Sequence, residues 1–579
     1  ALLVVESPTK ARTIARFFGR PSKREVGPLT VFETTTGDFF LSVVASKGHV
    51  FDLVTKGGFH GVEVHDGHFI PIYGTIKRCR KCGEQYTDDL ETCPRCGSKL
   101  DDKAELLRAL AEVAKEVDVL LVGTDADAEG EKIGWDIATF LAPYVREIRR
   151  VEFHEITRRA LMEALKNPRE IDERLVEAQI LRRIEDRWIG FELSQKLQSY
   201  FRRKNLSAGR VQTPVLRWIA ERCRQWKKSF RDCFGLELEN GLRVVLRLPR
   251  MSARQVRATI ERLRGASCYI KRVELEEVEL APPPPFTTDA MLREASARLK
   301  MGAREVMALA QELFEVGLIT YHRTDSTRVS SAGIRVAREY ISERWGEELL
   351  APRTWATGEE GAHECIRPTR PIDAQRLRQL IQMGVIRLAR RLSREHFRLY
   401  DLIFKRFIAS QMKKAKLLKQ KAVVAVEGQE LTVEGYCEII EPGFTHIRPV
   451  RLIPRASEGP VRVKEVRHWI EAEVKPFTEG ELVALMKERG IGRPSTYAKI
   501  ITTLLEREYV KRGRGGRLYA TQRGYQVLNY LDGRFSQYVS EETTRRLEEA
   551  MKAVEEGRAS YIEILRRLYE EIRILSGVA

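Results

Sequence analysis

Short apolar runs alternate with helical periodicity along the first third of the chain. Residues 2–5 (LLVV) and 118–124 (DVLLVGT) are mostly apolar and short, which predicts two buried strands. Residues 7–10 (SPTK) have the polar cap and early proline of a helix start, and another helical stretch begins near residue 129. Strands that alternate with helices in this way predict an α/β domain with a parallel sheet.

The rest of the chain divides into longer blocks of helical and strand pattern. The predicted blocks are helices over 155–202, strands over 230–280 with a turn at Gly241, a stiff proline joint at 282–285, helices over 287–316, a strand over 318–321, helices over 330–420 with an irregular stretch at 352–371, strands over 421–470, and helices over 478–575. No internal repeat stands out. The overall class is therefore α/β plus α+β, in several domains.

Length and charge narrow the class further. A chain of 579 residues is too long for one hydrophobic core, so about three to five domains are expected. The net charge of +18 and the pI near 9.5 favour a polyanionic partner. The cations are spread along the chain, which favours a folded basic groove over a disordered arm. Charged residues make up 31% and asparagine occurs only at 167, 205, 240 and 529, a composition that leans towards a thermophile.

The distribution of apolar residues also indicates where in the cell the protein is expected. No run of about 18 apolar residues occurs, so no membrane partner is expected. The N-terminal segment ALLVVE lacks the cationic stretch of a signal peptide, so a cytoplasmic protein associated with the nucleoid is predicted. The chain does not begin with Met, and we expect it to be a fragment or a processed product.

Four of the nine cysteines form a metal-binding pattern. Cys79-x2-Cys82 and Cys93-x2-Cys96 are each followed by glycine, and each turn directs two thiolates toward one tetrahedral ion. The other five cysteines are scattered singly, as in a reducing compartment rather than a disulfide framework. We predict a structural Zn²⁺ site in an insert rich in Lys and Arg.

Acidic residues follow both of the predicted N-terminal strands. Glu6 comes directly after the first strand, and Asp125, Asp127 and Glu129 come after the second. In a parallel sheet these positions meet at one edge, where such folds bind ligands. Oxygen ligands in this number suit Mg²⁺, and Lys10 in the first helical turn suits a phosphate. The plainer alternative is a solvated acidic loop.

Residues 317–327 (GLITYHRTDST) place one tyrosine between an apolar run and a polar cluster. A phenol is a weak nucleophile because its ordinary pKa is about 10, so it needs help from neighbouring groups. Arg323 lies two residues after Tyr321 and is able to hold a phosphodiester. The plainer alternative is a tyrosine that only packs.

This segment resembles the active-site motif of type IA DNA topoisomerases. The acidic pairs resemble the Toprim fold that topoisomerases share with some primases and nucleases. Further segments resemble signatures of the same family: 46–49 (SKGH), 206–214 (LSAGRVQTP), 362–369 (AHECIRPT) and 490–497 (GIGRPSTY), the last of which predicts a helix that ends at glycine and another that starts at Ser495. The cysteine insert inside the Toprim region resembles the topoisomerase half of reverse gyrases.

The resemblance implies a role for each matching residue. The catalytic residues would be Tyr321, which forms a 5′-phosphotyrosyl link, Glu6 as general acid–base, and Arg323, Lys10 and His363 around the phosphate. Mg²⁺ would be held by Asp125, Asp127 and Glu129, and Zn²⁺ by Cys79, Cys82, Cys93 and Cys96. The DNA-binding residues would be His49, Arg210, Gln212, Gln311, Glu315, Thr324, Asp325, Arg367, Arg493, Ser495 and Thr496.

The resemblance also implies a toroid of four domains. These are a Toprim domain over 1–155 with the zinc insert at 74–100, a helical DNA-binding domain over 156–220 and 478–579, a strand-rich arch over 221–285 and 406–477, and a helical gate domain over 286–405 that carries Tyr321. The expected partner is DNA, single-stranded at the cleavage site.

The chain has no Gly-x4-Gly-Lys-Ser/Thr loop, so any use of ATP would come from an N-terminal helicase module that the sequence does not include. The resemblance implies that the chain, when joined to that module, introduces positive supercoils with ATP. The alternatives are a standalone type IA enzyme that relaxes negative supercoils, a Toprim nuclease or primase that does not use the tyrosine, and a non-catalytic clamp for single strands.

Overall fold

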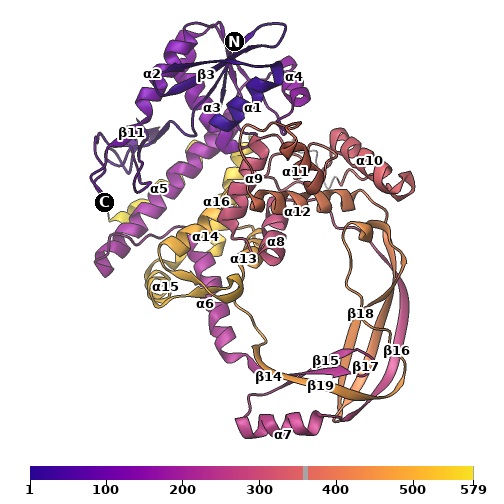
Figure 1. The fold of residues 1–579 in the computed structure, drawn as a ribbon. Coiled ribbons are helices and arrows are strands. Elements are labelled where there is room, and N and C mark those ends of the chain that lie inside the picture. The colour runs from indigo at the N-terminus through magenta and orange to yellow at the C-terminus, as the bar shows by residue number, and fades with distance from the viewer. Residues whose placement is uncertain (356–362, 578–579) are drawn as a thin grey trace.

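The computed structural model describes residues 1–355 and 363–577, and its ribbon closes into a ring (Figure 1). An α/β unit lies at one end of the molecule and a curved β-sheet at the other, and the helical units between them close the ring together with the sheet (Figure 1). Among the described residues, no helix combines the length and the apolar character that crossing a bilayer requires.

The α/β unit is built on a six-stranded sheet with the order β13-β12-β1-β4-β3-β2. Strands β13 (Glu147–Arg150), β12 (Val119–Val122), β1 (Leu2–Val5) and β4 (Phe40–Ala45) run parallel, which confirms the predicted parallel arrangement for this part. Strands β3 (Leu29–Thr35) and β2 (Ser22–Val26) add an antiparallel edge that the alternation of strands and helices did not predict.

Local capping signals place the helices of this unit. Ser7 caps α1 (Pro8–Ala15) by accepting a hydrogen bond from the Lys10 amide, and Asp127 caps α3 (Ala128–Leu141) by accepting one from the Gly130 amide. Helix α2 (Lys103–Ala114) begins directly after the cysteine insert. The capped ends of α1 and α3 lie at the carboxyl ends of β1 and β12, so Glu6 and the 125–129 segment meet at one edge of the sheet.

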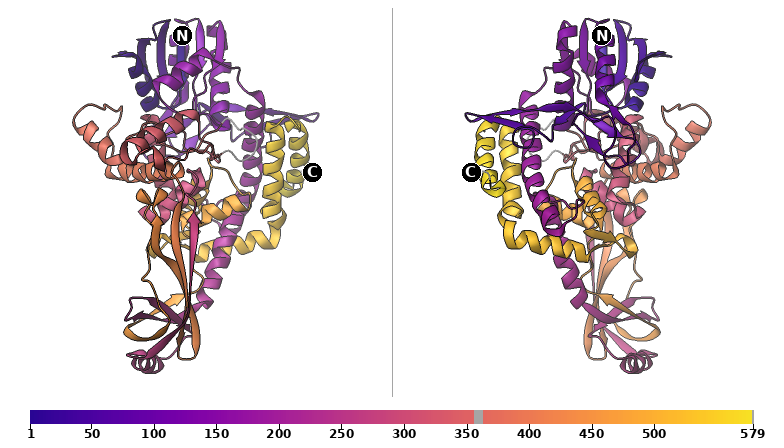
Figure 2. Two further views of the ribbon diagram at one scale, coloured as in Figure 1. Left: turned by 90° about the vertical axis from the view of Figure 1, so that its right-hand side faces the viewer. Right: turned by 90° about the vertical axis from the view of Figure 1, so that its left-hand side faces the viewer.

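Between β4 and α2 the chain forms short antiparallel strands. They are β5 (Phe51–Leu53) with β8 (Tyr73–Thr75), β6 (Val62–His65) with β7 (His68–Pro71), and a three-stranded sheet of β9 (Lys77–Cys79), β10 (Gln85–Tyr86) and β11 (Leu100–Asp102) that carries the cysteines. The β6–β7 hairpin reaches across to the C-terminal helices (Figure 2). There Phe59 and Phe69 pack edge-on against Tyr569, and Trp188 joins the same aromatic cluster.

The first helical unit combines two distant parts of the chain. Its elements are α4 (Arg158–Lys166), α5 (Glu173–Phe201), α6 (Gln212–Lys228), α13 (Glu479–Glu488), α14 (Tyr497–Glu506), β20 (Val510–Arg512), β21 (Leu518–Ala520), α15 (Gln522–Phe535), α16 (Glu541–Glu555) and α17 (Tyr561–Ser576). The long helix α5 packs against α16 and α17. Helix α14 begins at Tyr497 with Thr496 as its N-cap, so the cap lies one residue after the predicted Ser495.

The curved sheet has the strand order β15-β14-β19-β16-β17-β18 and also draws on two parts of the chain. Its elements are β14 (Phe230–Leu238), β15 (Arg243–Leu248), α7 (Ala253–Leu263), β16 (Ser267–Leu280), β17 (Ala415–Val426), β18 (Gln429–Glu441) and β19 (Gly459–Ala472). Strand β19 pairs with both β14 and β16. Strands β16 and β17 are antiparallel neighbours in which Leu280 lies opposite Ala415.

A second helical unit is inserted between β16 and β17. It contains α8 (Thr288–Leu299), α9 (Ala303–Glu315), α10 (Ser331–Trp345), α11 (Ala374–Gln382) and α12 (Arg394–Ser410).

The predicted strand over 318–321 was wrong, because Ile319 and Thr320 make only isolated bridges to Pro368 and Glu155. The predicted domain boundaries at 220 and 405 fall inside α6 and α12, and part of the predicted irregular stretch at 352–371 lies outside the described residues. Short 3₁₀ turns complete the chain: η1 (Arg16–Phe18), η2 (Ala142–Tyr144), η3 (Glu347–Leu349), η4 (Gly443–His446), η5 (Arg514–Gly516) and η6 (Ser536–Tyr538).

Candidate active site and metal centre

Tyr321 lies where the inserted helical unit meets the acidic edge of the α/β unit. Its hydroxyl donates a hydrogen bond to Asp127 Oδ2 at 2.6 Å, and its backbone N–H donates to the carbonyl of His154. The turn before it depends on Gly317, which has φ +75°, and a Cβ there would come within 2.4 Å of the Ile156 carbonyl oxygen. The structure thus brings together a tyrosine and an aspartate that are 194 residues apart in the sequence.

The carboxyl group of Glu6 faces the same point from β1. Its Oε1 accepts a hydrogen bond of 3.0 Å from the backbone N–H of Asp125. Lys10, which is buried, donates to Asp125 Oδ1 at 3.0 Å and to the Gly123 carbonyl at 2.9 Å. The segment after β1, including the first turn of α1, and the segment after β12 therefore hold the Glu6 carboxyl and the Lys10 ammonium group in fixed positions around Asp125.

Cations neutralise the remaining acids of this edge. Arg323 approaches Glu129 Oε2 at 3.0 Å and Asp127 Oδ2 at 3.5 Å. The His49 ring contacts the other oxygen of Glu129 at 3.2 Å. In this conformation, each predicted Mg²⁺ ligand is already paired with a cation or a phenol of the chain.

Burial and charge set the protonation of the two groups that would move protons. Burial raises the pKa of Tyr321 well above its usual value, and the Asp127 and Asp125 carboxylates add to the effect, so the phenol is neutral here. Burial also raises the pKa of Glu6 to about 8, with Asp125 and Asp127 adding to it. Near neutral pH, Glu6 is therefore able to act as a proton donor.

The loop 46–49 carries His49 and is tied to the cysteine insert through one lysine. Lys103 Nζ donates to the carbonyls of Ser46 and Lys47, both at 2.8 Å, and the Gly48 amide donates to the Glu6 carbonyl. Lys103 directly follows β11, the last strand of the insert. The insert and the acidic edge therefore share one chain of hydrogen bonds.

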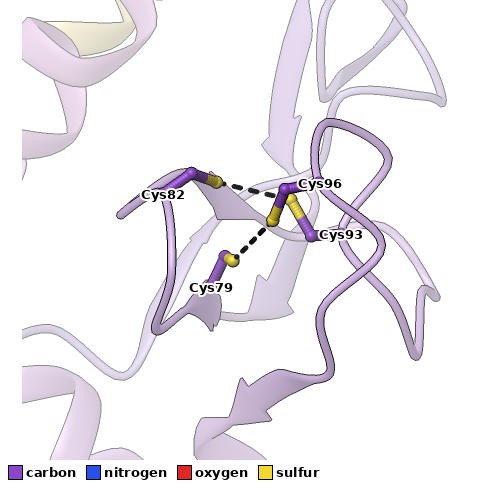
Figure 3. A group of neighbouring side chains, drawn as sticks. All are labelled: Cys79, Cys82, Cys93 and Cys96. Carbon is purple, nitrogen blue, oxygen red and sulfur yellow. Dashed lines mark hydrogen bonds between the residues drawn. The ribbon is translucent and has the colours of Figure 1, made fainter.

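The four predicted zinc ligands converge. The sulfur atoms of Cys79, Cys82, Cys93 and Cys96 lie within 4.8 Å of one another (Figure 3). The Tyr86 hydroxyl contacts Cys93 Sγ at 3.5 Å and lowers the pKa of that thiol to about 6. Four thiols from two tight turns fit a tetrahedral Zn²⁺ ion with no open position.

The acidic edge fits Mg²⁺ in ligand chemistry but is not arranged as a cage. Asp125, Asp127 and Glu129 offer the hard oxygen ligands that Mg²⁺ prefers. Within the part of the chain that the structure describes, these carboxylates do not gather as tightly as the cysteines do. Their oxygens are held by Lys10, Arg323 and Tyr321, so ion binding would require part of this pairing to be released.

A groove of about 930 Å³ opens on one side of Arg323. It joins the acidic edge, the inserted unit and the C-terminal helices. Several residues predicted from the sequence line it: Asp127, Glu129, Arg323, Thr324, Asp325, His363, Arg493 and Ser495. Thr496 lies just behind, where its hydroxyl accepts a hydrogen bond from the Arg493 amide. Arg182 on α5 also lines the groove and was missed, although the polar run RRIEDR within a helical block is a signal that was available.

Two arginines predicted to contact DNA are buried instead. Arg210 packs against Glu185, Asp186 and Glu548, and the nearby Gln212 side chain donates to the Ser207 carbonyl. The prediction that Arg210 meets DNA finds no open surface in this conformation, because its side chain is only 1% exposed.

Arg367 is paired with Glu364 on its own unit and with Glu155 on the α/β unit. The resemblance implied that Arg367 binds DNA, whereas both of these ion pairs lie within the protein. In this conformation its side chain joins two units and does not face the groove.

A second cavity, of about 440 Å³, is also lined by Arg323. It is lined by Glu6, Lys47, Met307, Gln311, Glu315 and His322, among others. Gln311 and Glu315 lie one helical turn apart on α9, and the Gln311 amide donates to Glu315 Oε1 at 3.1 Å. The predicted pair is thus present in a cavity that Glu6 and Arg323 also line.

Comparison with known proteins agrees with this geometry. A family model described as DNA topoisomerase matches residues 170–566, and one described as Toprim domain matches residues 1–156. The chain is 52% identical to a reverse gyrase of Pyrococcus furiosus and 46% identical to reverse gyrase 1 of Aquifex aeolicus, each over 99% of this chain and 47% of the relative.

A solved structure has a closely similar fold. Full-length topoisomerase I of Thermotoga maritima superposes with a TM-score of 0.74 at 30% identity, over 99% of this chain and 90% of that one. The chain spans about half the length of the curated relatives it matches, whereas it spans nearly all of this solved one.

Proposed function

Because this chain belongs to the type IA DNA topoisomerase family, we propose that Tyr321 is the nucleophile with which it cleaves one strand of DNA. The observation that supports this most directly is the contact between the Tyr321 hydroxyl and the acidic edge, at 2.6 Å from Asp127. The phenol oxygen bonds to the phosphorus, the bond to the 3′-oxygen breaks, and a 5′-phosphotyrosyl link results. Resealing reverses these steps and needs no ATP.

Two proton transfers accompany this reaction. The Tyr321 hydroxyl already donates its hydrogen bond to Asp127 Oδ2, so this carboxylate is in place to accept the proton. Glu6 carries a proton at neutral pH, since its pKa is about 8, and gives it to the leaving 3′-oxygen. In resealing, Glu6 takes that proton back.

Positive groups offset the charge on the phosphate oxygens. Arg323 and Lys10 lie beside the acidic edge, and His363 lines the groove next to it. A Mg²⁺ ion held by Asp125, Asp127 and Glu129 would supply further positive charge there when bound. A phosphate that draws Arg323 away would also free the oxygens that this arginine holds.

The groove of about 930 Å³ is proposed to hold the single-stranded segment. Arg493 and Ser495, together with the backbone at the start of α14, suit phosphate groups. His49, Thr324 and Asp325 border the cleavage point, while Gln212, Arg210 and Thr496 hold this surface in shape. The net charge of +18 fits a polyanion.

The proposed passage of a second strand through the break depends on the division into four domains. The Toprim domain and the C-terminal helices form a base, the curved sheet forms an arch, and the inserted unit forms a gate that carries Tyr321. Opening the gate separates Tyr321 from Asp127 and gives another strand access to the ring. The cysteine cluster is proposed to hold Zn²⁺ as a structural ion.

We further propose that the full protein is a reverse gyrase. The support is the likeness to reverse gyrases over nearly the whole chain, together with the share of about half that the chain takes of their length. A helicase module in the remaining part would couple ATP to positive supercoiling in the cytoplasm. This chain alone is expected to cleave and reseal DNA without ATP.

Tyr321→Phe tests the assignment of the nucleophile. The variant should lose covalent capture of single-stranded DNA, trapped with alkali or detergent, and keep its DNA affinity. Tyr340→Phe is a matched control in the same unit, because its hydroxyl donates only to Asp373 there. Covalent adducts that survive in Tyr321→Phe would rule the assignment out, and cut DNA without any adduct would favour a Toprim nuclease.

A further inference from the structure

Arg323 lines both the main groove and the cavity of about 440 Å³. If Arg323 holds the scissile phosphate, the strand extends along the groove, and a nucleotide next to that phosphate comes within reach of the smaller cavity. Ligand sites of about 300–1,000 Å³ are typical for small organic groups, so the cavity has room for one nucleobase.

Two buried polar atoms border this cavity and have no hydrogen-bond partner among the described residues. They are Gln311 Oε1 and His322 Nδ1. Buried polar atoms are normally paired, because leaving one unpaired costs its lost hydration. His322 is 1% exposed, and both side chains line the cavity. A bound group would supply the partners that both atoms lack.

The orientation of Gln311 fixes what kind of atom it offers. Its Nε2 donates to Glu315 Oε1, which leaves Oε1 as the atom without a partner. The unpaired atom of Gln311 is therefore an acceptor, on a side chain that lines the cavity. The imidazole of His322 adds a ring nitrogen beside it, and Met307 and Ala308 provide an apolar wall.

We propose that this cavity is a base-recognition subsite that takes one nucleotide next to the cleaved phosphodiester, and that it selects bases with an exocyclic amine. The amine of adenine, cytosine or guanine donates to Gln311 Oε1, and the ring nitrogen of His322 meets the neighbouring edge of the base. Thymine places no amine there and leaves Gln311 unpaired. This inference rests on the proposed cleavage reaction.

The test uses single-stranded oligonucleotides with one cleavage site. All four bases are placed in turn at each of the two positions that flank the cleaved bond, and covalent adduct is measured at subsaturating DNA. At one of these positions, thymine should lower the adduct yield about tenfold relative to cytosine. Replacing cytosine by 2-pyrimidinone, which lacks only the amine, should cause the same loss in the wild-type chain.

Gln311→Leu removes the acceptor and keeps the size of the side chain. In this variant the four bases and 2-pyrimidinone should react alike, because the amine has no partner left. Gln379→Leu, an exposed glutamine on α11 of the same unit, is the matched control and should keep the base preference. The analogue in the wild-type chain gives an answer even if Gln311→Leu folds poorly.

The outcomes separate the two proposals. Adducts whose yield does not depend on either flanking base, or a preference that persists in Gln311→Leu, would overturn the base subsite. A wild-type chain that forms no adduct with any oligonucleotide would instead overturn the proposed function.

Discussion

Replacing Glu155 with glutamine tests what keeps the gate closed. Glu155 Oε2 contacts Arg367 NH2 at 2.8 Å across the junction between the Toprim domain and the gate, and the two side chains are 8% and 1% exposed. The contacts that Tyr321, Thr13 and Arg323 make across this junction are hydrogen bonds or partly exposed pairs. We therefore expect the Glu155–Arg367 pair to make the largest electrostatic contribution to closure.

The size of the effect follows from what glutamine keeps. It keeps one oxygen that accepts from Arg367 but loses the negative charge. The bond that remains is still one to a charged group, which contributes about 1.5–3 kcal/mol, so only the attraction between opposite charges is lost and closure should weaken by about 1 kcal/mol. Arg367 keeps its pair with Glu364 in either state, and Arg159, which also pairs with Glu155, is half exposed, so no buried charge is left unpaired. A loss of about 1 kcal/mol corresponds to an open population raised about fivefold.

Hydrogen exchange at two neighbouring amides provides the assay. The Tyr321 amide donates to His154 across the junction, whereas the Thr320 amide donates to Arg367 within the gate. Opening the gate as a rigid unit exposes the first amide and leaves the second protected. Exchange resolved to single amides by fragmentation should therefore show Tyr321 about fivefold faster in Glu155→Gln and Thr320 unchanged.

A matched substitution controls for charge. Glu163 faces Arg159 at 3.8 Å with both side chains more than half exposed, so Glu163→Gln should leave both amides unchanged. Equal acceleration of both amides in Glu155→Gln would indicate local unfolding rather than opening. No acceleration of either amide would refute the idea that this ion pair holds the gate.

Two further predictions concern the acid and the zinc insert. Glu6 donates its proton only in the acid form, and its pKa is raised to about 8. The rate constant of single-turnover cleavage should therefore stay constant near pH 7 and fall about tenfold per pH unit above pH 8. The Glu6→Gln variant should cleave slowly at every pH and show no such fall. A pH profile of Glu6→Gln that still falls there would contradict this. Lys103→Met should slow cleavage about tenfold by freeing the loop before His49, whereas Lys103→Arg should not. Equal rates in both Lys103 variants would refute a positioning role.

Features with local signals could be predicted from the sequence. The capped start of α1 at Ser7 and the meeting of four cysteines both depend on residues close together in the chain, and the structure confirms them. The position of Tyr321 beside Asp127 came from a family resemblance, since no local rule joins residues that far apart.

Features that depend on distant partners could not be predicted. Arg210 looked like an exposed DNA contact, yet Glu548, its partner, follows it by 338 residues and buries it. Glu155 had no signal of its own, because an acid before a helix is common and Arg367 lies 212 residues later. Strand pattern likewise gave no means of predicting that β19 pairs with both β14 and β16.

The pairing of Leu280 with Ala415 has a mechanical consequence. The chain leaves the arch for the gate after Leu280 and returns at Ala415, and these two residues lie side by side in neighbouring strands. Both covalent tethers of the gate therefore start from one pivot, and a swing about that pivot stretches neither of them. If the inserted unit opens as proposed, it acts as a lever about that pivot, so a small twist of β16 and β17 would be enlarged at the parts of the unit that lie far from it.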